Sequence, residues 1–220
     1  MKAFNKLIFL FLITTVAVLS TTTQAKSKDI RLEVTVTNLT KSVILTPPFV
    51  AVGKHPEKLF SLGMPASEAM AILAEGGDFS ALAESLEGRV DLIDFQGPIL
   101  PASSKSRVVE VARNSYIHLA SMLLPTNDGF IGLNGFRLRD LLKAPKYLSA
   151  YDAGTEENDE LCASIPGPQC GGEGYSPAEG EGIVHPHSGI HGESELSRSA
   201  YAWGNPVAKI SVRVVKRKKK

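Results

Sequence analysis

Five carboxylates stand close together in one glycine-containing stretch of the sequence, and a sixth stands in a turn before it. The turn is Asn127-Asp128-Gly129, between two apolar runs, where we expect an exposed side chain. Carboxylates this dense repel one another unless solvent screens them or a cation lies among them. Calcium in proteins takes roughly six to eight oxygen ligands, so calcium binding is one hypothesis and a solvated loop with a hairpin turn is the other. The five residues of the stretch are Asp152, Glu156, Glu157, Asp159 and Glu160.

Three histidines form a second group that could bind a metal, in His185-Pro186-His187-Ser188-Gly189-Ile190-His191. On an extended segment His185 and His187 lie on the same face, and a turn at Ser188-Gly189 could bring His191 towards them. Three imidazoles around an open position are the ligands of a catalytic zinc ion. The alternative is a strand edge and turn with histidines that only form hydrogen bonds. A transition-metal site or metalloenzyme at His185, His187 and His191 is therefore the alternative to calcium.

Other common site motifs are absent. The acidic stretch is not an EF-hand, because the glycine required at the sixth loop position would be Glu157 and the closing glutamate would be Ala163. There is no Gly-x-Ser-x-Gly, no phosphate-binding glycine loop and no dinucleotide fingerprint. We therefore expect a binding protein and not an enzyme.

Three segments of the chain resemble the spondin domain of extracellular matrix proteins and its bacterial relatives. The most specific part is the block Tyr151-Asp152-Ala153-Gly154-Thr155, and the likeness covers most of the chain after residue 25. The matching segments are Ser121–Leu133, Tyr151–Glu156, and Val34–Thr40 with Pro47-Pro48 after it.

The resemblance implies a β-sandwich similar to the calcium-dependent membrane-docking sandwiches, with calcium held at one tip by acidic side chains from two loops. By position, the implied ligands are Asp128, Asp152 and Glu156, and Glu156 stands where the animal members have aspartate. The implied function is an adhesion or ligand-binding module, in which calcium orders a loop tip that docks an extracellular or cell-surface protein or glycan.

The domain that must position these residues begins and ends with segments whose sequence predicts β-strands. Ile30 to Thr37 alternates apolar and polar residues, and Val207 to Val215 repeats the pattern. Such alternation is typical of half-buried strands, so both segments should pack on one core. The sequence predicts a mainly β protein, an antiparallel β-sandwich.

Short helical insertions interrupt the strands. Pro65 to Glu75 predicts one helix that stops at Gly76-Gly77, and Asp78 is a plausible cap for a second helix that ends at Gly88. After Asp152 the chain is poor in apolar residues until Ile183, which predicts a long surface loop. Further strands are predicted at 90–95, 107–112 and 116–124.

The first residues predict export. Lys2 and Lys6 precede an apolar run from Leu7 to Leu19, too short for a membrane span, and a polar stretch then leads to Ala25. We expect a signal peptide over residues 1–25, cleaved after Ala25, a sandwich domain over 26–215 and a basic tail over 216–220. The mature protein should be secreted or periplasmic, with no integral membrane segment.

Export also bears on the cysteines and the charge. Cys162 and Cys170 should close a disulfide in an oxidising compartment. The alternatives are free thiols or a redox pair, although the spacing is not Cys-x-x-Cys. Without Lys2 and Lys6, 22 basic residues face 23 acidic ones, and five of the basic residues lie in the tail. The body is therefore acidic, which gives no support to nucleic-acid binding.

Overall fold

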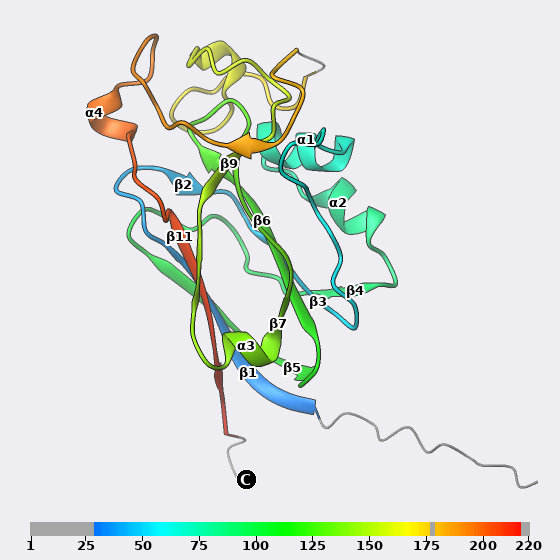
Figure 1. The fold of residues 1–220 in the computed structure, drawn as a ribbon. Coiled ribbons are helices and arrows are strands. Elements are labelled where there is room, and N and C mark those ends of the chain that lie inside the picture. The colour runs from blue at the N-terminus through cyan, green and yellow to red at the C-terminus, as the bar shows by residue number, and fades with distance from the viewer. Residues whose placement is uncertain (1–28, 177–178, 217–220) are drawn as a thin grey trace, which may run out of the picture.

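The computed structural model describes residues 29–176 and 179–216 of the chain (Figure 1). The predicted signal peptide of residues 1–25, with its cleavage after Ala25, lies outside the described residues, and so does the predicted tail except for Lys216. Among the described residues, no helix combines the length and the apolar character needed to cross a membrane.

Two antiparallel sheets form the body of the protein, which confirms the predicted mainly β, sandwich-like fold (Figure 1). The smaller sheet has the order β5-β1-β11-β8, and the larger has the order β10-β9-β7-β6-β3-β4 with β2 paired to β6. Strand bounds are β1 Asp29–Asn38, β2 Ile44–Leu45, β3 Phe49–Gly53, β4 Val90–Leu92, β5 Ser104–Ala112, β6 Tyr116–Leu124, β7 Gly129–Arg137, β8 Lys146–Leu148, β9 Ala150–Asp152, β10 His185–Pro186 and β11 Ala208–Val214.

The first and last described strands are neighbours in the smaller sheet. Val34 of β1 lies opposite Val212 of β11, and the two strands run antiparallel. The alternation in the sequence therefore predicted both strands and their shared core. The strand β6 is also found as predicted, whereas β5 begins earlier than predicted and β4 ends earlier.

The main core lies between the sheets. Both sheets contribute inward-facing aliphatic side chains, and these are almost completely buried. This burial is the main source of stability, at about 25 cal/mol per Å² of apolar surface. Examples are Leu32, Val34 and Val36 of β1, Leu119 and Leu123 of β6, and Ile131 of β7.

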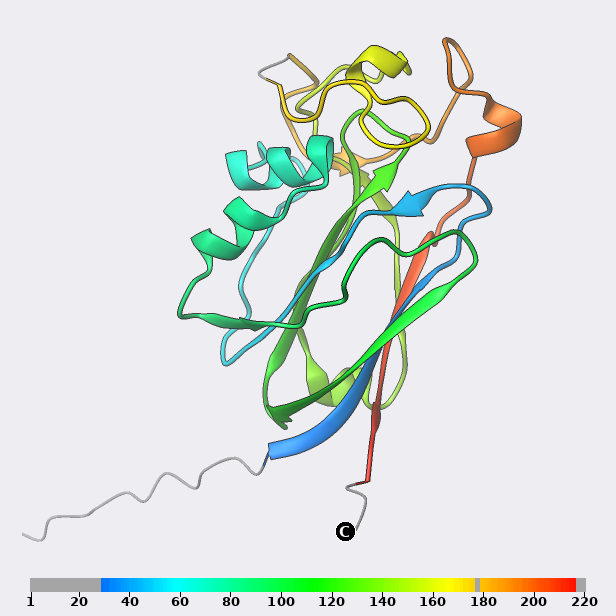
Figure 2. The same ribbon diagram turned by 180° about the vertical axis from the view of Figure 1, so that it is seen from behind.

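The helices α1 and α2 cover the outer face of the larger sheet near the end that carries the long loops (Figure 2). The helix α1 begins after its cap Ser67, three residues later than the predicted Pro65, and ends at Gly76 with the left-handed Gly77 as its C-cap. The second helix starts one residue later than predicted: Phe79 is its first flanking residue, and Asp78 instead accepts the Ser80 N–H. Helix bounds are α1 Glu68–Gly76, α2 Ser80–Ser85, α3 Leu138–Leu141, the 3-10 helix η1 Cys162–Ser164 and α4 Arg198–Tyr201.

The predicted disulfide between Cys162 and Cys170 is present in the long irregular segment. Replacing both cysteines with serine should lower the free energy of unfolding by roughly 2–3 kcal/mol, because the bridge closes a short loop and restricts the unfolded chain. Urea denaturation of both proteins checks this. Reduced wild type should match the double variant, and equal stability of oxidised wild type and the variant would contradict the expectation.

Candidate metal centre

Pairing of β7 with β9 brings the two predicted calcium-binding loops together at one end of the sandwich (Figure 1). Gly129, the first residue of β7, lies opposite Asp152, the last residue of β9. The Ala153 N–H donates to the Asp128 carbonyl at 3.3 Å, which continues the contact beyond the strands. Asp128 and Asp152 therefore lie close together, although they stand in different loops.

Asp128 is completely buried, and the prediction of an exposed turn residue was wrong. Its Oδ2 accepts the Thr155 N–H at 2.7 Å and the Glu156 N–H at 3.2 Å, so the side chain points inward and holds the second loop. Its Oδ1 is buried and has no hydrogen-bond partner among the described residues.

Asp152 is also buried and is oriented by two donors from its own loop. The Gly154 N–H donates to Oδ1 at 2.8 Å, and the Asn158 side-chain amide donates to Oδ2 at 2.7 Å. His185 of β10 lies opposite Asp152 in the sheet, with Nε2 at 3.4 Å from Oδ1.

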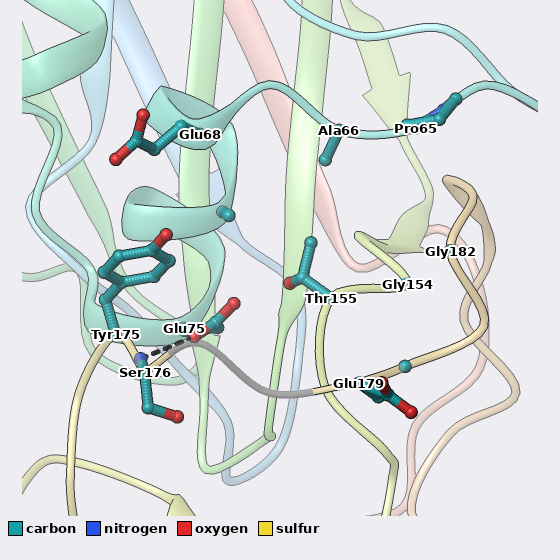
Figure 3. Close-up of a pocket in the computed structure, with 12 residues that line it drawn as sticks. Pro65, Ala66, Glu68, Glu75, Gly154, Thr155, Tyr175, Ser176, Glu179 and Gly182 are labelled. Carbon is teal, nitrogen blue, oxygen red and sulfur yellow. Dashed lines mark hydrogen bonds between the residues drawn. The ribbon is translucent and has the colours of Figure 1, made fainter.

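Glu156 lies near the carboxylate of Glu75, at the end of α1, which the sequence analysis did not predict to be part of a site. Ser176 links the two: its hydroxyl donates to Glu156 Oε1 at 3.2 Å, and its N–H donates to Glu75 Oε2 at 3.0 Å, the bond dashed in Figure 3. The other oxygen of each carboxylate, Glu156 Oε2 and Glu75 Oε1, is buried without a hydrogen-bond partner among the described residues.

Burial makes these carboxylates hard to ionise. Burial and the charge of Asp152 raise the pKa of Asp128 to about 6, and burial and the charge of Glu75 raise the pKa of Glu156 to about 7. Burial also raises the pKa of Asp152 and of Glu75. Among the described residues, no lysine or arginine forms an ion pair with any of the four.

A cavity of about 470 Å³ opens beside this cluster, between α1 and the irregular segment (Figure 3). Glu75, Thr155 and Tyr175 are among the residues that line it, and none of the described lining residues is a lysine, arginine or histidine. Its lining residues are Pro65, Ala66, Glu68, Ala71, Glu75, Gly154, Thr155, Tyr175, Ser176, Glu179, Gly180 and Gly182.

The three histidines of the alternative prediction lie in different surroundings. His187 is buried, packs edge-on against Trp203 with ring centres 5.1 Å apart, and accepts the Gly189 N–H at Nδ1. Burial lowers the pKa of His187 to about 4, so it is neutral near pH 7. His191 is exposed, and the carboxylate of Glu193 lies 3.9 Å from its Nδ1.

One set of candidate ligands does come close together in the described part of the chain. Atoms of Asp152, Glu181 and His185 all lie within 4.8 Å of one another. Of the predicted calcium ligands only Asp152 belongs to this set, and of the three histidines only His185 does. Although partial burial lowers the pKa of His185, the Pro186 carbonyl and the charges of Asp152 and Glu181 raise it above the usual value.

Two other acidic residues of the stretch, Asp159 and Glu160, have structural roles. Asp159 accepts from the Asn127 side chain at 2.8 Å and from the Leu161 N–H at 2.9 Å. Glu160 is buried and accepts the backbone N–H groups of Gly192 and Glu193. The sequence suggested that the negative charge of this stretch is either solvated or bound to a cation. Backbone N–H donors instead stabilise the part of it that Asp159 and Glu160 carry.

Among the described residues, Asp128, Asp152 and Glu156 do not form a group whose ligand atoms all lie within 4.8 Å of one another, although all three carboxylates are buried. Buried carboxylate oxygens without partners are costly, and a bound cation would relieve that cost. No family model matches the chain, and no curated protein sequence matches it significantly.

Proposed function

We propose that this protein is an exported calcium-binding module of spondin type. Calcium, held by Asp128, Asp152 and Glu156, orders the loop tip, and the ordered tip docks an extracellular or cell-surface protein or glycan. The protein acts by binding and not by catalysis.

The observation that supports calcium most is the pair of buried oxygens without partners in the described part of the chain, Asp128 Oδ1 and Glu156 Oε2. Both carboxylates are oriented through their other oxygen, by the Thr155 N–H and the Ser176 hydroxyl respectively. Each side chain is thus held in place while one oxygen stays free for an ion. Buried polar atoms without partners are rare in folded proteins, and a bound ion is one way to satisfy them.

The donor chemistry favours calcium over smaller ions. Calcium accepts carboxylate, carbonyl and water oxygens in flexible geometry at roughly 2.3–2.6 Å. The three proposed ligands supply only carboxylate oxygens, and carbonyls or water can complete the shell. Binding would draw Glu156 and Asp128 towards Asp152 and so order the loop that begins at Gly154.

A docking role for the tip is supported by apolar side chains exposed on the irregular segment. Leu161, Tyr175 and Ile183 are each about 40% exposed, and they lie in the same stretch as the proposed ligands. Exposed aromatic and aliphatic side chains on ordered loops are common contact residues in protein interfaces.

Thermal unfolding with excess calcium and with chelator tests the proposal. Calcium should add about 2.7 kcal/mol to the free energy of unfolding when it is a hundredfold above Kd, because it binds only the folded state. Asp128→Asn should remove the gain, since the amide keeps the acceptor for Thr155 but places an NH₂ group where the free oxygen was. Glu157→Gln, at an exposed neighbour in the loop, is the matched control. Equal melting temperatures with calcium and with chelator would refute the calcium site.

A further inference from the structure

Asp152, Glu181 and His185 converge at the edge of the larger sheet. The β9–β10 pairing places His185 opposite Asp152, and Glu181 approaches from the segment before β10. His185 Nε2 lies 3.4 Å from Asp152 Oδ1 and 3.8 Å from Glu181 Oε2. One imidazole nitrogen thus faces two carboxylates.

The hydrogen bonding of His185 assigns its tautomer. Its Nδ1 lies 3.1 Å from the Pro186 carbonyl, which can only accept, so Nδ1 carries the hydrogen. In the neutral ring Nε2 then has a free lone pair, and Nε2 is buried without a hydrogen-bond partner among the described residues. A lone pair this close to two carboxylates is repulsive unless a proton or a metal ion lies between them. A ring N–H bound to a backbone carbonyl is the usual outer support of a metal-binding histidine.

Both carboxylates are also held in place from outside. Asp152 accepts from the Gly154 N–H and the Asn158 amide, and the same amide reaches Glu181 Oε1 at 3.4 Å. Asn158 therefore contacts both acidic members of the set and fixes their separation. Outer-shell donors of this kind contribute about 10–100-fold to metal affinity.

We propose that Asp152, Glu181 and His185 bind a divalent transition ion of the zinc type. Bond lengths of about 2.0–2.2 Å in a tetrahedral site place neighbouring ligand atoms about 3.4 Å apart, close to the two separations found here. Imidazole favours zinc, copper or nickel, whereas calcium takes oxygen ligands. The side chains of Glu181 and His185 are 43% and 31% exposed, which leaves a fourth position open to water or to a donor from a partner.

The site differs from the proposed calcium site and shares one ligand with it, Asp152. Glu181 and His185 take no part in calcium binding, and Asp128 and Glu156 take no part here. Both cysteines of the chain are in the disulfide, so no thiolate competes for zinc.

Calorimetric titration of the full exported chain with zinc chloride, prepared without a histidine tag, tests this site. One zinc ion should bind per chain. His185→Gln and Glu181→Gln should each weaken binding more than about 100-fold, and Asn158→Ala should weaken it about 10–100-fold. His191→Gln is the matched control and should bind like wild type. Cobalt substituted for zinc should give the visible absorption of a four-coordinate ion, and His185→Gln should lack it.

Two results would overturn the proposal. Absence of zinc binding by wild type would refute the site, and equal affinity in wild type and His185→Gln would place the ion elsewhere. Glu156→Gln distinguishes the two sites, since it should keep zinc binding and lose the response to calcium. Failure of calcium binding with zinc binding intact would refute the proposed function alone.

Discussion

Glu156→Gln should make this protein more stable than wild type in chelator at pH 7.5, and less stable than wild type in calcium. A pKa of about 7 against an ordinary 4.5 means that ionising buried Glu156 costs up to roughly 3 kcal/mol in the folded state. Glutamine keeps the shape of the neutral acid and avoids that cost. With calcium present, wild type gains the binding free energy and the variant does not.

Varying the pH in chelator tests the direction in which Glu156→Gln changes the free energy of unfolding. Because the folded-state pKa is raised, the stability that Glu156 contributes is complete below about pH 4.5 and is lost as the pH rises through about 7. The advantage of Glu156→Gln should therefore vanish near pH 4. The buried histidines His118 and His187, whose pKa is lowered, contribute stability that is lost as the pH falls. This happens in both proteins, so it cancels in the difference between their free energies of unfolding.

Urea denaturation at several pH values provides the measurement, and Glu157→Gln is the control. A variant less stable than wild type in chelator at pH 7.5 would contradict the burial argument.

Gly154→Ala should destabilise the protein by about 3 kcal/mol or more and remove its response to calcium. Gly154 has φ +67°, and a Cβ there would lie 2.3 Å from the Ile183 carbonyl oxygen. The backbone must move to relieve such a contact, because no flexible side chain is involved. The Gly154 N–H would then leave Asp152, and the loop that carries Glu156 would shift with it.

Gly182→Ala is the matched control for this prediction. Gly182 also has a left-handed φ, +78°, and its N–H donates to the Gly154 carbonyl at 2.8 Å, but a Cβ there meets nothing within 4 Å among the described residues. It should cost only about 1–2 kcal/mol of backbone strain and keep the calcium response. Melting curves with calcium and with chelator compare the two variants. Similar losses of stability in both variants would show that the left-handed backbone conformation, and not the close approach to Ile183, causes the destabilisation.

Local patterns were sufficient to predict the framework. Alternation over Ile30–Thr37 and Val207–Val215 predicted two strands on one core. The proline and double glycine around α1 predicted a helix there and its end, although the helix begins at Glu68 and not at Pro65. These signals are short in range, since side-chain alternation and helix caps depend on a few consecutive residues. The resemblance of both loops placed Asp128 and Asp152 in one site, and the β7–β9 pairing does bring them together.

Two acidic residues of the site could not be predicted. Glu75 follows the buried residues of α1 and is buried with them, where a glutamate at the end of a short helix normally reaches solvent. It is covered by Ser176, which lies about a hundred residues later in a segment without regular structure. Glu181 lies in the same segment. The position of Glu75 on the apolar face of the helix was the one sequence signal for its burial. The contacts of Ser176 and Glu181 could not be predicted, because irregular loops leave no periodic pattern in the sequence.

The pairing of Val34 with Val212 also determines when the protein can finish folding. The strand β1 is an inner strand of its sheet, and both of its neighbours, β5 and β11, come later in the chain. Until residues 208–214 are available, one edge of β1 has unpaired backbone groups and the main core is incomplete. Contacts between residues so far apart in sequence form slowly, because a long loop must close first. This domain should therefore complete its fold only after residues 208–214 have been made, and it should be open to chaperones and proteases until then.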